Sequence, residues 1–286
     1  MPEPGKGGRL VLVGTPIGNL EDLSPRALRA LQEADAILCE DTRVTAKLAS
    51  RFDFGAERIS CPGPREKERV ADLLRRLAAG QTVALVSDAG MPGLSDPGEH
   101  LVAAAASAGH DVRVIPGPSA PAAALSLAGI PAVPHVFLGF LPARSGERRR
   151  FLESLRGRTE TLVWFEAPHR LLESLEDAAR TLGPRRACVA RELTKIHEEA
   201  VRGTLPELAA LFRSRGEGRG EVTVVVEGGR EEPAAMEDGE LDSEIRKALS
   251  AGAGKRAAAR ELARRSGRPA REIYARAVSL ARGPKS

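Results

Sequence analysis

Residues 87–98 combine side chains and glycines that could hold a small ligand close to the main chain. The segment reads SDAGMPGLSDPG and follows the apolar run 82–86, which predicts a buried strand leading into a long loop. Glycines allow a close approach of the ligand, prolines stiffen the loop, and Asp88 and Asp96 add negative charge. We predict a ligand-binding loop, because an ordinary connection in an α/β unit takes only about 2 to 6 residues.

Three more segments place polar or glycine-bearing residues directly after apolar runs. Residues 14–20, 40–43 and 116–121 follow the apolar runs 10–13, 36–39 and 112–115. The carboxyl ends of parallel strands meet at one edge of a sheet, so these loops should converge with the first one into a single site. Residues 14–18 lack the glycine order of a dinucleotide fingerprint and the lysine of a phosphate loop, which disfavours dinucleotide and triphosphate binding.

Apolar runs alternate with amphipathic segments from Arg9 onward, which is typical of βαβ units. The pattern predicts an α/β fold with an N-terminal α/β domain at 9–125 and a second α/β domain at 126–229. Residues 230–245 are acidic and weakly patterned, and they indicate a linker. Residues 246–286 show helical periodicity at 248–262 and at 269–280, separated by a turn, which resembles a helix-turn-helix.

The charge is distributed unevenly along the chain. Residues 246–286 contain 12 Lys and Arg residues against 2 acidic ones, whereas the remainder contains 31 against 37. A basic terminal module on a mildly acidic body suits a polyanionic partner, and we expect Lys255, Arg256 and Arg260 to contact RNA. The alternatives are a merely solvated charged surface and a helical hairpin used for dimer packing.

Composition excludes several other classes of protein. No apolar run approaches the roughly 18 residues of a membrane span, and the first residues lack the apolar region of a secretory signal, so we expect a cytoplasmic protein without membrane attachment. Cys39, Cys61 and Cys188 lie far apart and match no zinc spacing. Neither a metal nor a disulfide is expected.

Six motifs occur in order along the chain: TPIGNLED at 15–22, CEDTR at 39–43, SDAGMPGLSDPG at 87–98, PGPS at 116–119, FEAPHR at 165–170 and RELTK at 191–195. Together they resemble one known family, that of ribosomal RNA small-subunit methyltransferase I in the tetrapyrrole methylase superfamily. The resemblance runs from about residue 9 to residue 228 and includes the basic helical tail.

The resemblance implies a class III methyltransferase with S-adenosylmethionine in the cleft between two α/β domains and a small basic helical module at the C-terminus. It implies 2′-O-methylation of a cytidine in the decoding region of 16S ribosomal RNA, by a homodimer that acts on the small ribosomal subunit. We expect the cofactor to be bound by Thr15, Pro16, Asp88, Ala89, Gly90, Ser119, Ala120 and Phe165.

The proposed reaction needs alignment of the methyl group with the ribose oxygen and a group that takes the proton from the ribose. Candidates at strand ends are Glu40, Asp41, Glu166, Glu192 and Lys195. We favour Lys195 with Glu192 and Glu166, because burial can lower the pKa of a lysine and make it a base or an electrostatic partner of the developing alkoxide. The alternative for Lys195 is contact with an RNA phosphate.

Basic residues in the body are expected to contact RNA phosphates. Arg43 and Arg170 suit phosphate binding better than catalysis, and Arg148, Arg149 and Arg150 form a basic patch between the two domains. Aromatic residues are scarce, so phosphate contacts and recognition of folded RNA shape should dominate over base stacking.

The sequence departs from the family pattern at two places. Residues 60–66 stand where relatives commonly carry a His-rich stretch, and Met91 stands where Thr is usual. Two other functions are open at this point. One is methylation of a small tetrapyrrole, which has no need of the basic tail, and the other is a non-catalytic adaptor that binds ribosomal RNA.

Overall fold

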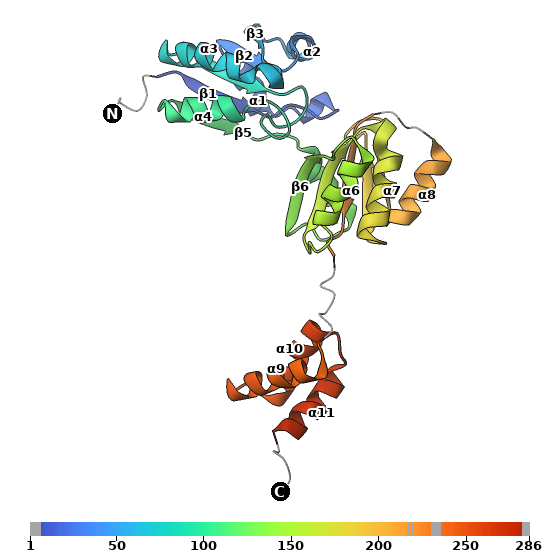
Figure 1. Ribbon diagram of the computed structural model, residues 1–286. Coiled ribbons are helices and arrows are strands. Elements are labelled where there is room, and N and C mark those ends of the chain that lie inside the picture. Colours follow the sequence, from blue (N-terminus) through green and yellow to red (C-terminus); the bar gives the residue numbers. More distant parts are fainter. Residues whose placement is uncertain (1–6, 217, 219, 230–235, 282–286) are drawn as a thin grey trace. The chain divides into compact units, whose positions relative to one another are not determined.

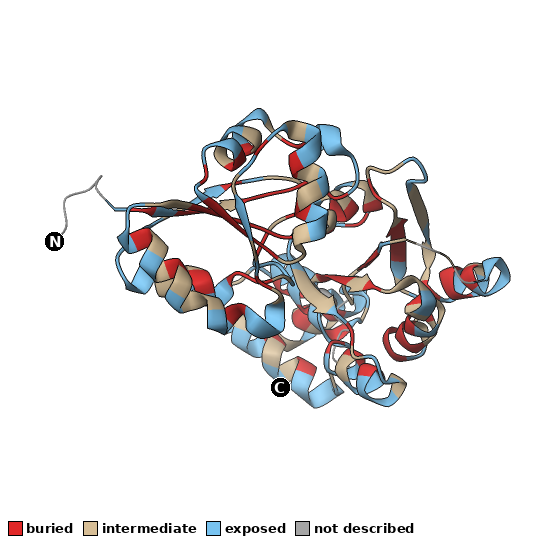
Figure 2. Ribbon diagram, turned by 90° about the horizontal axis from the view of Figure 1, so that it is seen from above, coloured by how far each residue is buried: buried red, intermediate tan, exposed pale blue. Residues whose placement is uncertain are grey.

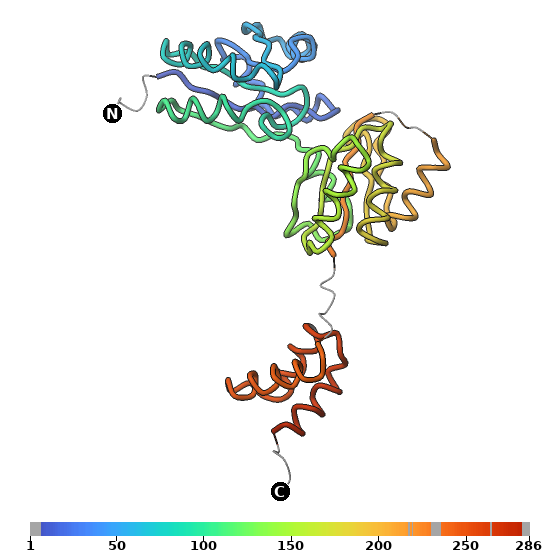
Figure 3. The backbone as a smooth tube through the Cα atoms, in the orientation of Figure 1, coloured from blue at the N-terminus to red at the C-terminus, as the bar shows by residue number. Residues whose placement is uncertain are grey.

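The computed structural model describes residues 7–216, 218, 220–229 and 236–281. The chain divides into two units, residues 1–229 and 230–286. The first unit contains two sheets, and Figure 3 shows that the chain completes one before it enters the other. Buried residues lie along the strands and on the inward faces of the helices (Figure 2).

Five parallel strands form the first sheet, in the order β3-β2-β4-β1-β5 (Figure 1). The strands are β1 (Arg9–Val13), β2 (Ala36–Cys39), β3 (Glu57–Ser60), β4 (Thr82–Val86) and β5 (Asp111–Ile115). The first four strands lead into helices α1 (Pro25–Gln32), α2 (Thr42–Phe52), α3 (Glu66–Ala78) and α4 (Glu99–Ser107). Short 3₁₀ helices precede two of these, η1 (Leu20–Asp22) before α1 and η2 (Gly63–Arg65) before α3. Helices α1 and α2 pack on one face and α3 and α4 on the other, which is why the central strands are apolar throughout.

A buried carboxylate holds the far end of the long loop after β4. Glu66 begins α3 and is 6% exposed. Its Oε1 accepts hydrogen bonds from the N–H groups of Gly98, His100 and Leu101, at 3.0, 2.8 and 3.2 Å. These N–H groups begin α4 and have no acceptor within the helix. Glu66 therefore fixes where residues 87–98 end.

The second sheet is mixed and has the order β6-β7-β10-β8-β9. Its strands are β6 (His135–Phe140), β7 (Thr161–Glu166), β8 (Arg186–Arg191), β9 (Glu199–Thr204) and β10 (Val222–Val226). Strand β10 pairs antiparallel with both β7 and β8. The helices of this part are α5 (Ala120–Ala128), α6 (Ser145–Ser154), α7 (Leu171–Leu182) and α8 (Leu205–Arg215), with the 3₁₀ helix η3 (Pro168–Arg170) before α7.

Helix α5 packs on the second sheet although it directly follows the last strand of the first. Ala124 and Leu125 lie in one apolar cluster with Val163, Cys188 and Val225 of the second sheet. The expected boundary after residue 125 thus falls inside a helix that packs mainly on the second sheet. The helix is also the covalent connection between the two sheets.

Residues 236–281, the described part of the C-terminal unit, form three helices, α9 (Asp238–Ser250), α10 (Lys255–Ser266) and α11 (Ala270–Leu280). They share a small core that includes Leu241, Ile245 and Ile273. The expected single helix at 248–262 is wrong, because Gly252 adopts a left-handed φ of 86° and separates α9 from α10. Helix α9 begins within the expected linker, whose residues 230–235 lie outside the described part of the chain.

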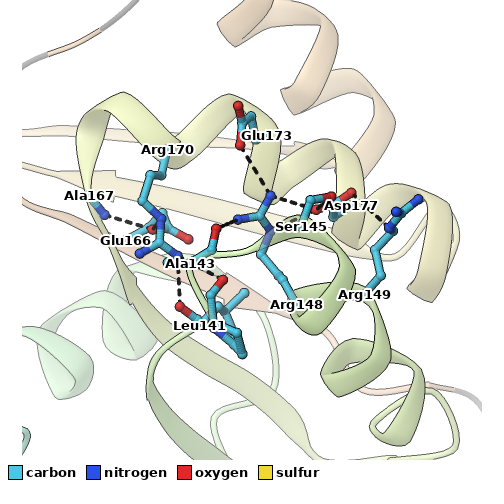
Figure 4. A network of polar contacts seen from close by, with 11 residues as sticks. Leu141, Ala143, Ser145, Arg148, Arg149, Glu166, Ala167, Arg170, Glu173 and Asp177 are labelled. Atoms are coloured by element: carbon cyan, nitrogen blue, oxygen red, sulfur yellow. Dashed lines mark hydrogen bonds and ion pairs between the residues drawn. The ribbon is translucent and has the colours of Figure 1, made fainter.

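Arg148 joins α6 to α7 in the second part of the first unit (Figure 4). Its side chain is fully buried, and its guanidinium contacts Asp177 at 2.7 and 2.8 Å. The same group donates to the carbonyl of Ala143 at 3.2 Å, while Ser145 donates to Asp177 at 2.9 Å. The expectation that Arg148 contacts RNA is wrong, because this side chain has no surface to present.

We predict that Arg148→Met destabilises the first unit by about 3 to 5 kcal/mol, since it leaves the carboxylate of Asp177 buried without its main cation. Arg150→Met, on the exposed side of α6, should change stability by less than about 0.5 kcal/mol. Urea unfolding followed by circular dichroism measures both. Equal stability of the two variants would show that the buried pair is dispensable.

Candidate functional site

The loops after β1, β4 and β5 are held together mainly through backbone contacts. Thr15 and Gly90 exchange hydrogen bonds, with N···O distances of 2.8 and 3.1 Å. The Thr15 hydroxyl donates to the carbonyl of Ser87 at 3.2 Å. A Cβ on Gly14 would lie 2.6 Å from the Cα of Gly117, so this crossing of the first and third loops requires glycine.

A cavity of about 290 Å³ opens beside these loops. It is lined by residues 89–91 and 94–96 of the long loop, by residues 119–121 at the start of α5, and by residues of the second sheet. The second-sheet lining consists of Phe140, residues 165–168 and residues 220–223, with Ile17 from the first loop. The lining is mostly apolar with a few polar groups, as is usual for small-molecule sites.

Five of the eight residues expected to bind the cofactor line this cavity: Ala89, Gly90, Ser119, Ala120 and Phe165. The other three do not line it. Thr15 and Pro16 are buried, and Thr15 uses its polar groups on Ser87 and Gly90. The Asp88 carboxylate accepts from the N–H of Asp41 at 3.0 Å and ties the long loop to the end of β2. Their place in the structure is to support the loops.

Three carboxylates line the cavity: Asp96, Glu166 and Glu221. Burial is the main cause that raises the pKa of Asp96; a hydrogen bond from Ser87 opposes it, and the nearby charge of Asp88 adds to it. Asp96 has no cationic partner among the described residues. It was noticed in the sequence only as part of the charged loop, and its exposure to the cavity follows from the fold.

Glu166 is 2% exposed, and its Oε1 contacts Arg170 at 3.2 Å (Figure 4). Arg170 also donates to the carbonyls of Leu141 and Pro142, at 2.8 and 3.2 Å. The second carboxylate oxygen, Oε2, is buried and has no hydrogen-bond partner within the described structure. A ligand that donates a hydrogen bond would satisfy this oxygen.

Phe140 and Phe165 form an aromatic wall of the cavity, with ring centroids 5.5 Å apart. The register of β6 shifts between Phe137 and Phe140, and Gly139 there has a φ of 63°. This irregularity leaves Phe140 59% exposed. Phe140 is absent from the residues expected in the site, because a shift in strand register is set by the neighbouring strand.

Lys195 lies in a network of carboxylates outside the cavity lining. Its Nζ is 3.0 Å from Glu192 Oε1 and 3.2 Å from Glu221 Oε2. Burial opposes the charge of the lysine, but the hydrogen bonds and ion pairs with the two glutamates outweigh it and raise its pKa. The expectation of a lowered pKa is therefore wrong, and Lys195 is a protonated ammonium group.

The turn that carries Lys195 contacts the first loop. The Thr194 hydroxyl accepts from the N–H of Asn19 at 3.0 Å. Glu192 and Thr194 have positive φ values of 47° and 66°, an uncommon conformation for residues with a side chain. Hydrogen bonds from Lys195 and from the N–H of Glu221 to Glu192 hold this backbone in place.

The remaining basic residues expected to contact RNA differ in exposure. Arg43 is exposed and paired with Asp41 at 2.6 Å, whereas Arg170 is mostly buried. The Arg43 hydrogen bonds lower the pKa of Asp41 to about 2. Arg149 and Arg150 are exposed on α6, and in the C-terminal unit Lys255, Arg256 and Arg260 are exposed on α10.

No group of three or more His, Cys, Asp or Glu residues in the described ranges has an arrangement suited to a metal ion. No helix there is long and apolar enough to cross a membrane. The three cysteines are buried free thiols, and burial raises the pKa of Cys61 to about 11.

Comparison with known families agrees with this architecture. The family model described as Tetrapyrrole (Corrin/Porphyrin) Methylases matches residues 9–209. A structure of diphthine synthase has the same fold, with a TM-score of 0.61 at 19% identity over 77% of this chain and 90% of that one. A second structure is that of uroporphyrin-III C-methyl transferase from Thermus thermophilus, complexed with S-adenyl homocysteine. It is 25% identical to this chain and has a TM-score of 0.51, and the match covers 77% of this chain and 97% of that one.

The family model, which matches most of the chain, thus places this protein in the tetrapyrrole methylase class. Two proteins named Ribosomal RNA small subunit methyltransferase I are more similar in sequence. That of Synechocystis sp. is 42% identical, covering 96% of this chain and 98% of the relative, and that of Mycobacterium tuberculosis is 47% identical, covering 77% and 78%. Within its class, the chain belongs to the ribosomal RNA small subunit methyltransferase I family.

We predict that Glu192→Gln destabilises the protein by about 1 to 2 kcal/mol near neutral pH. The hydrogen bond from the Glu221 N–H, opposed by burial and aided by Lys195, lowers the pKa of Glu192 below its ordinary 4.5. The stabilisation is therefore complete above the ordinary value and lost as the pH falls through the lowered pKa.

Urea unfolding of wild type and variant at about pH 7 and at successively lower pH values tests this expectation. The difference in free energy of unfolding between wild type and Glu192→Gln should become smaller as the pH is lowered. Glu21→Gln is the matched control, because Glu21 is exposed and its carboxylate has no partner among the described residues. If the loss of unfolding free energy in Glu192→Gln does not change with pH, the ionised carboxylate of Glu192 is not what stabilises the turn.

Proposed function

We propose that this chain transfers a methyl group from S-adenosylmethionine to the ribose 2′-oxygen of a cytidine in the decoding region of small-subunit ribosomal RNA. The family membership supports a methyltransferase that acts on this RNA. The six sequence motifs that resemble this family support the assignment to the ribose 2′-oxygen of a cytidine. The proposed active form is a homodimer. The single observation that carries the proposal is the cavity at the strand ends, lined by residues of four motifs shared with this family.

The residues of the cavity fit S-adenosylmethionine. The cofactor supplies an electrophilic methyl group on a positively charged sulfur. Residues 89–91, Ser119, Ala120 and Thr223 would hold it, and the aromatic wall offers an apolar surface. Asp96 and Glu221 favour a cation, and the unpartnered Oε2 of Glu166 offers an acceptor for an amino or hydroxyl group.

The chemistry asks the protein mainly to position the ribose and to remove its proton. Lys195 carries its proton already, so it suits stabilisation of negative charge or contact with a phosphate, and not proton abstraction. Among the carboxylates of the cavity, Asp96 is free of a cation partner within the described residues, and its raised pKa makes it a better base than an ordinary aspartate. We propose Asp96 as the proton acceptor.

RNA binding in this proposal rests on exposed cations. Arg43, Arg149 and Arg150 in the first unit and Lys255, Arg256 and Arg260 in the second suit phosphate contacts. Methylation of a small tetrapyrrole is the alternative within the class. The relatives named for tetrapyrrole or cobalamin substrates are only 21 to 25% identical, against 39 to 47% for those named for ribosomal RNA.

Incubation of the full chain with radiolabelled S-adenosylmethionine and unmodified small ribosomal subunits tests the proposal. We expect label on a ribose 2′-oxygen of cytidine, located by nuclease digestion and mass spectrometry of nucleosides. Ala120→Phe should abolish labelling and weaken cofactor binding at least about tenfold by calorimetry, because the ring fills the cavity.

Ala122→Phe is the matched control, since Ala122 lies on the same helix but is exposed and away from the lining. It should bind the cofactor like wild type. Labelling of a base, or transfer only to a tetrapyrrole acceptor, would refute the proposed activity. Cofactor binding without turnover on ribosomal subunits would favour a non-catalytic adaptor.

Replacing Lys255, Arg256 and Arg260 together by Gln should weaken binding to small ribosomal subunits while leaving cofactor affinity unchanged. Each lost phosphate contact lowers the slope of log affinity against log salt concentration by about 0.7 to 0.9, so we expect a total change of about 2 to 3. Filter binding over a range of salt concentrations measures the slope. An unchanged slope would remove these residues from the RNA interface.

A further inference from the structure

Besides the cavity, a hollow of about 560 Å³ lies on the first sheet. It is bounded by α1, by β1 and by the edge strand β5. From α1 and its C-cap it is lined by Arg26, Arg29, Ala30 and Glu33, which are spaced as one stripe of a helix. Arg9 and Val11 line it from β1, and Arg113 and Val114 from β5. We call this the arginine hollow, after Arg9, Arg26, Arg29 and Arg113.

The hollow exists because no helix of the described structure covers this part of the sheet. Helix α1 covers β1 with its apolar stripe, Ala27 and Leu31. Helix α5, which follows the edge strand β5, packs on the second sheet instead. Strand β5 is accordingly polar and exposed at Asp111 and Arg113, and Val114 is 55% exposed.

The cations of the hollow are only partly balanced by protein carboxylates. Arg113 pairs with Asp111 at 2.7 Å, and Arg26 donates to the carbonyl of Val114 at 3.5 Å. Arg9, Arg26 and Arg29 have no carboxylate partner among the described residues. Among the described residues that line the hollow, Glu33 is the one that carries a carboxylate. Grouping like charges in a shared concave surface favours an anion there.

We propose that the arginine hollow binds backbone phosphates of the ribosomal RNA substrate. This inference rests on the proposed function and names an additional contact surface for the same substrate. Planar guanidinium groups match phosphate oxygens in paired hydrogen bonds, and several on one rigid helix and sheet can read the spacing of successive phosphates. The polar lining makes the hollow unsuited to an apolar ligand or to an apolar protein partner.

The hollow also lies within reach of an extended substrate. Strand β1 contributes Arg9 at one end and, at the other, Val13, which leads into the loops of the cavity. Five strand residues span only about 17 Å, which is short compared with a folded RNA. Contacts along β1 and α1 can therefore act on the same RNA whose ribose enters the cavity.

Double substitution Arg26→Gln with Arg29→Gln in the full chain tests the proposal, with unmodified small ribosomal subunits as the probe. We expect affinity to fall on the order of tenfold at low salt, and the salt slope to fall by about 1 to 2. Affinity for S-adenosylmethionine, measured by calorimetry, should stay at the wild-type value. Arg58→Gln with Arg180→Gln removes the same charge from exposed positions outside the hollow and is the matched control.

The outcomes separate this inference from the proposed function. If wild type binds and methylates subunits but the double variant matches the control, the hollow has no part in RNA binding and only this inference fails. If wild type does not bind subunits at all, both fail. Titration with inorganic phosphate adds a further arm. A double variant that loses phosphate binding but keeps wild-type affinity for subunits would assign the hollow to a small anion and overturn the RNA assignment.

Discussion

The site depends on the close crossing of two backbones, at Gly14 after β1 and Gly117 after β5. Because neither residue has a Cβ, the first and third loops touch, and the Thr15 and Gly90 hydrogen bonds add the long loop to the same junction. Once these loops are fixed, α5 must start at the edge of the cavity. Its first residues then line the cavity while its apolar face reaches the second sheet.

Charged groups divide into those that build the protein and those available to ligands. The Arg148–Asp177 pair joins two helices and is withdrawn from solvent. Lys195 and Glu192 stabilise a turn whose backbone would otherwise be unfavourable. Asp96 has no such partner within the described residues, and this difference is what makes it a candidate for chemistry. Pairing, more than residue type, separates the two groups.

The centre of the first sheet could be predicted from the sequence because β1, β2 and β4 are mostly buried and read as apolar runs. Strand β9, Glu199–Thr204, was missed, since an edge strand with EAVRGT carries no such run. Three adjacent arginines suggested a basic patch, but successive helix residues point about 100° apart, so Arg148 faces inward while Arg149 and Arg150 face outward.

Long-range contacts explain the errors at the site. The carboxylate that helps raise the pKa of Lys195 belongs to Glu221, which is 26 residues away in sequence. The motif positions mark loops that meet at the cavity, and five of the eight expected residues line it. Which residues of a loop face a ligand and which hold the loop depends on partners that local sequence does not reveal.

The position of β10 in the second sheet has a consequence for biosynthesis. This strand is the last of the sheet in sequence, yet it lies between β7 and β8 and supplies pairing to both. The first sheet is complete once residue 115 has left the ribosome, whereas the second has no centre until residue 226 has emerged. During synthesis, α5 and the earlier strands of the second sheet therefore keep apolar surface exposed until β10 has been made. In this interval the nascent chain most needs protection from aggregation.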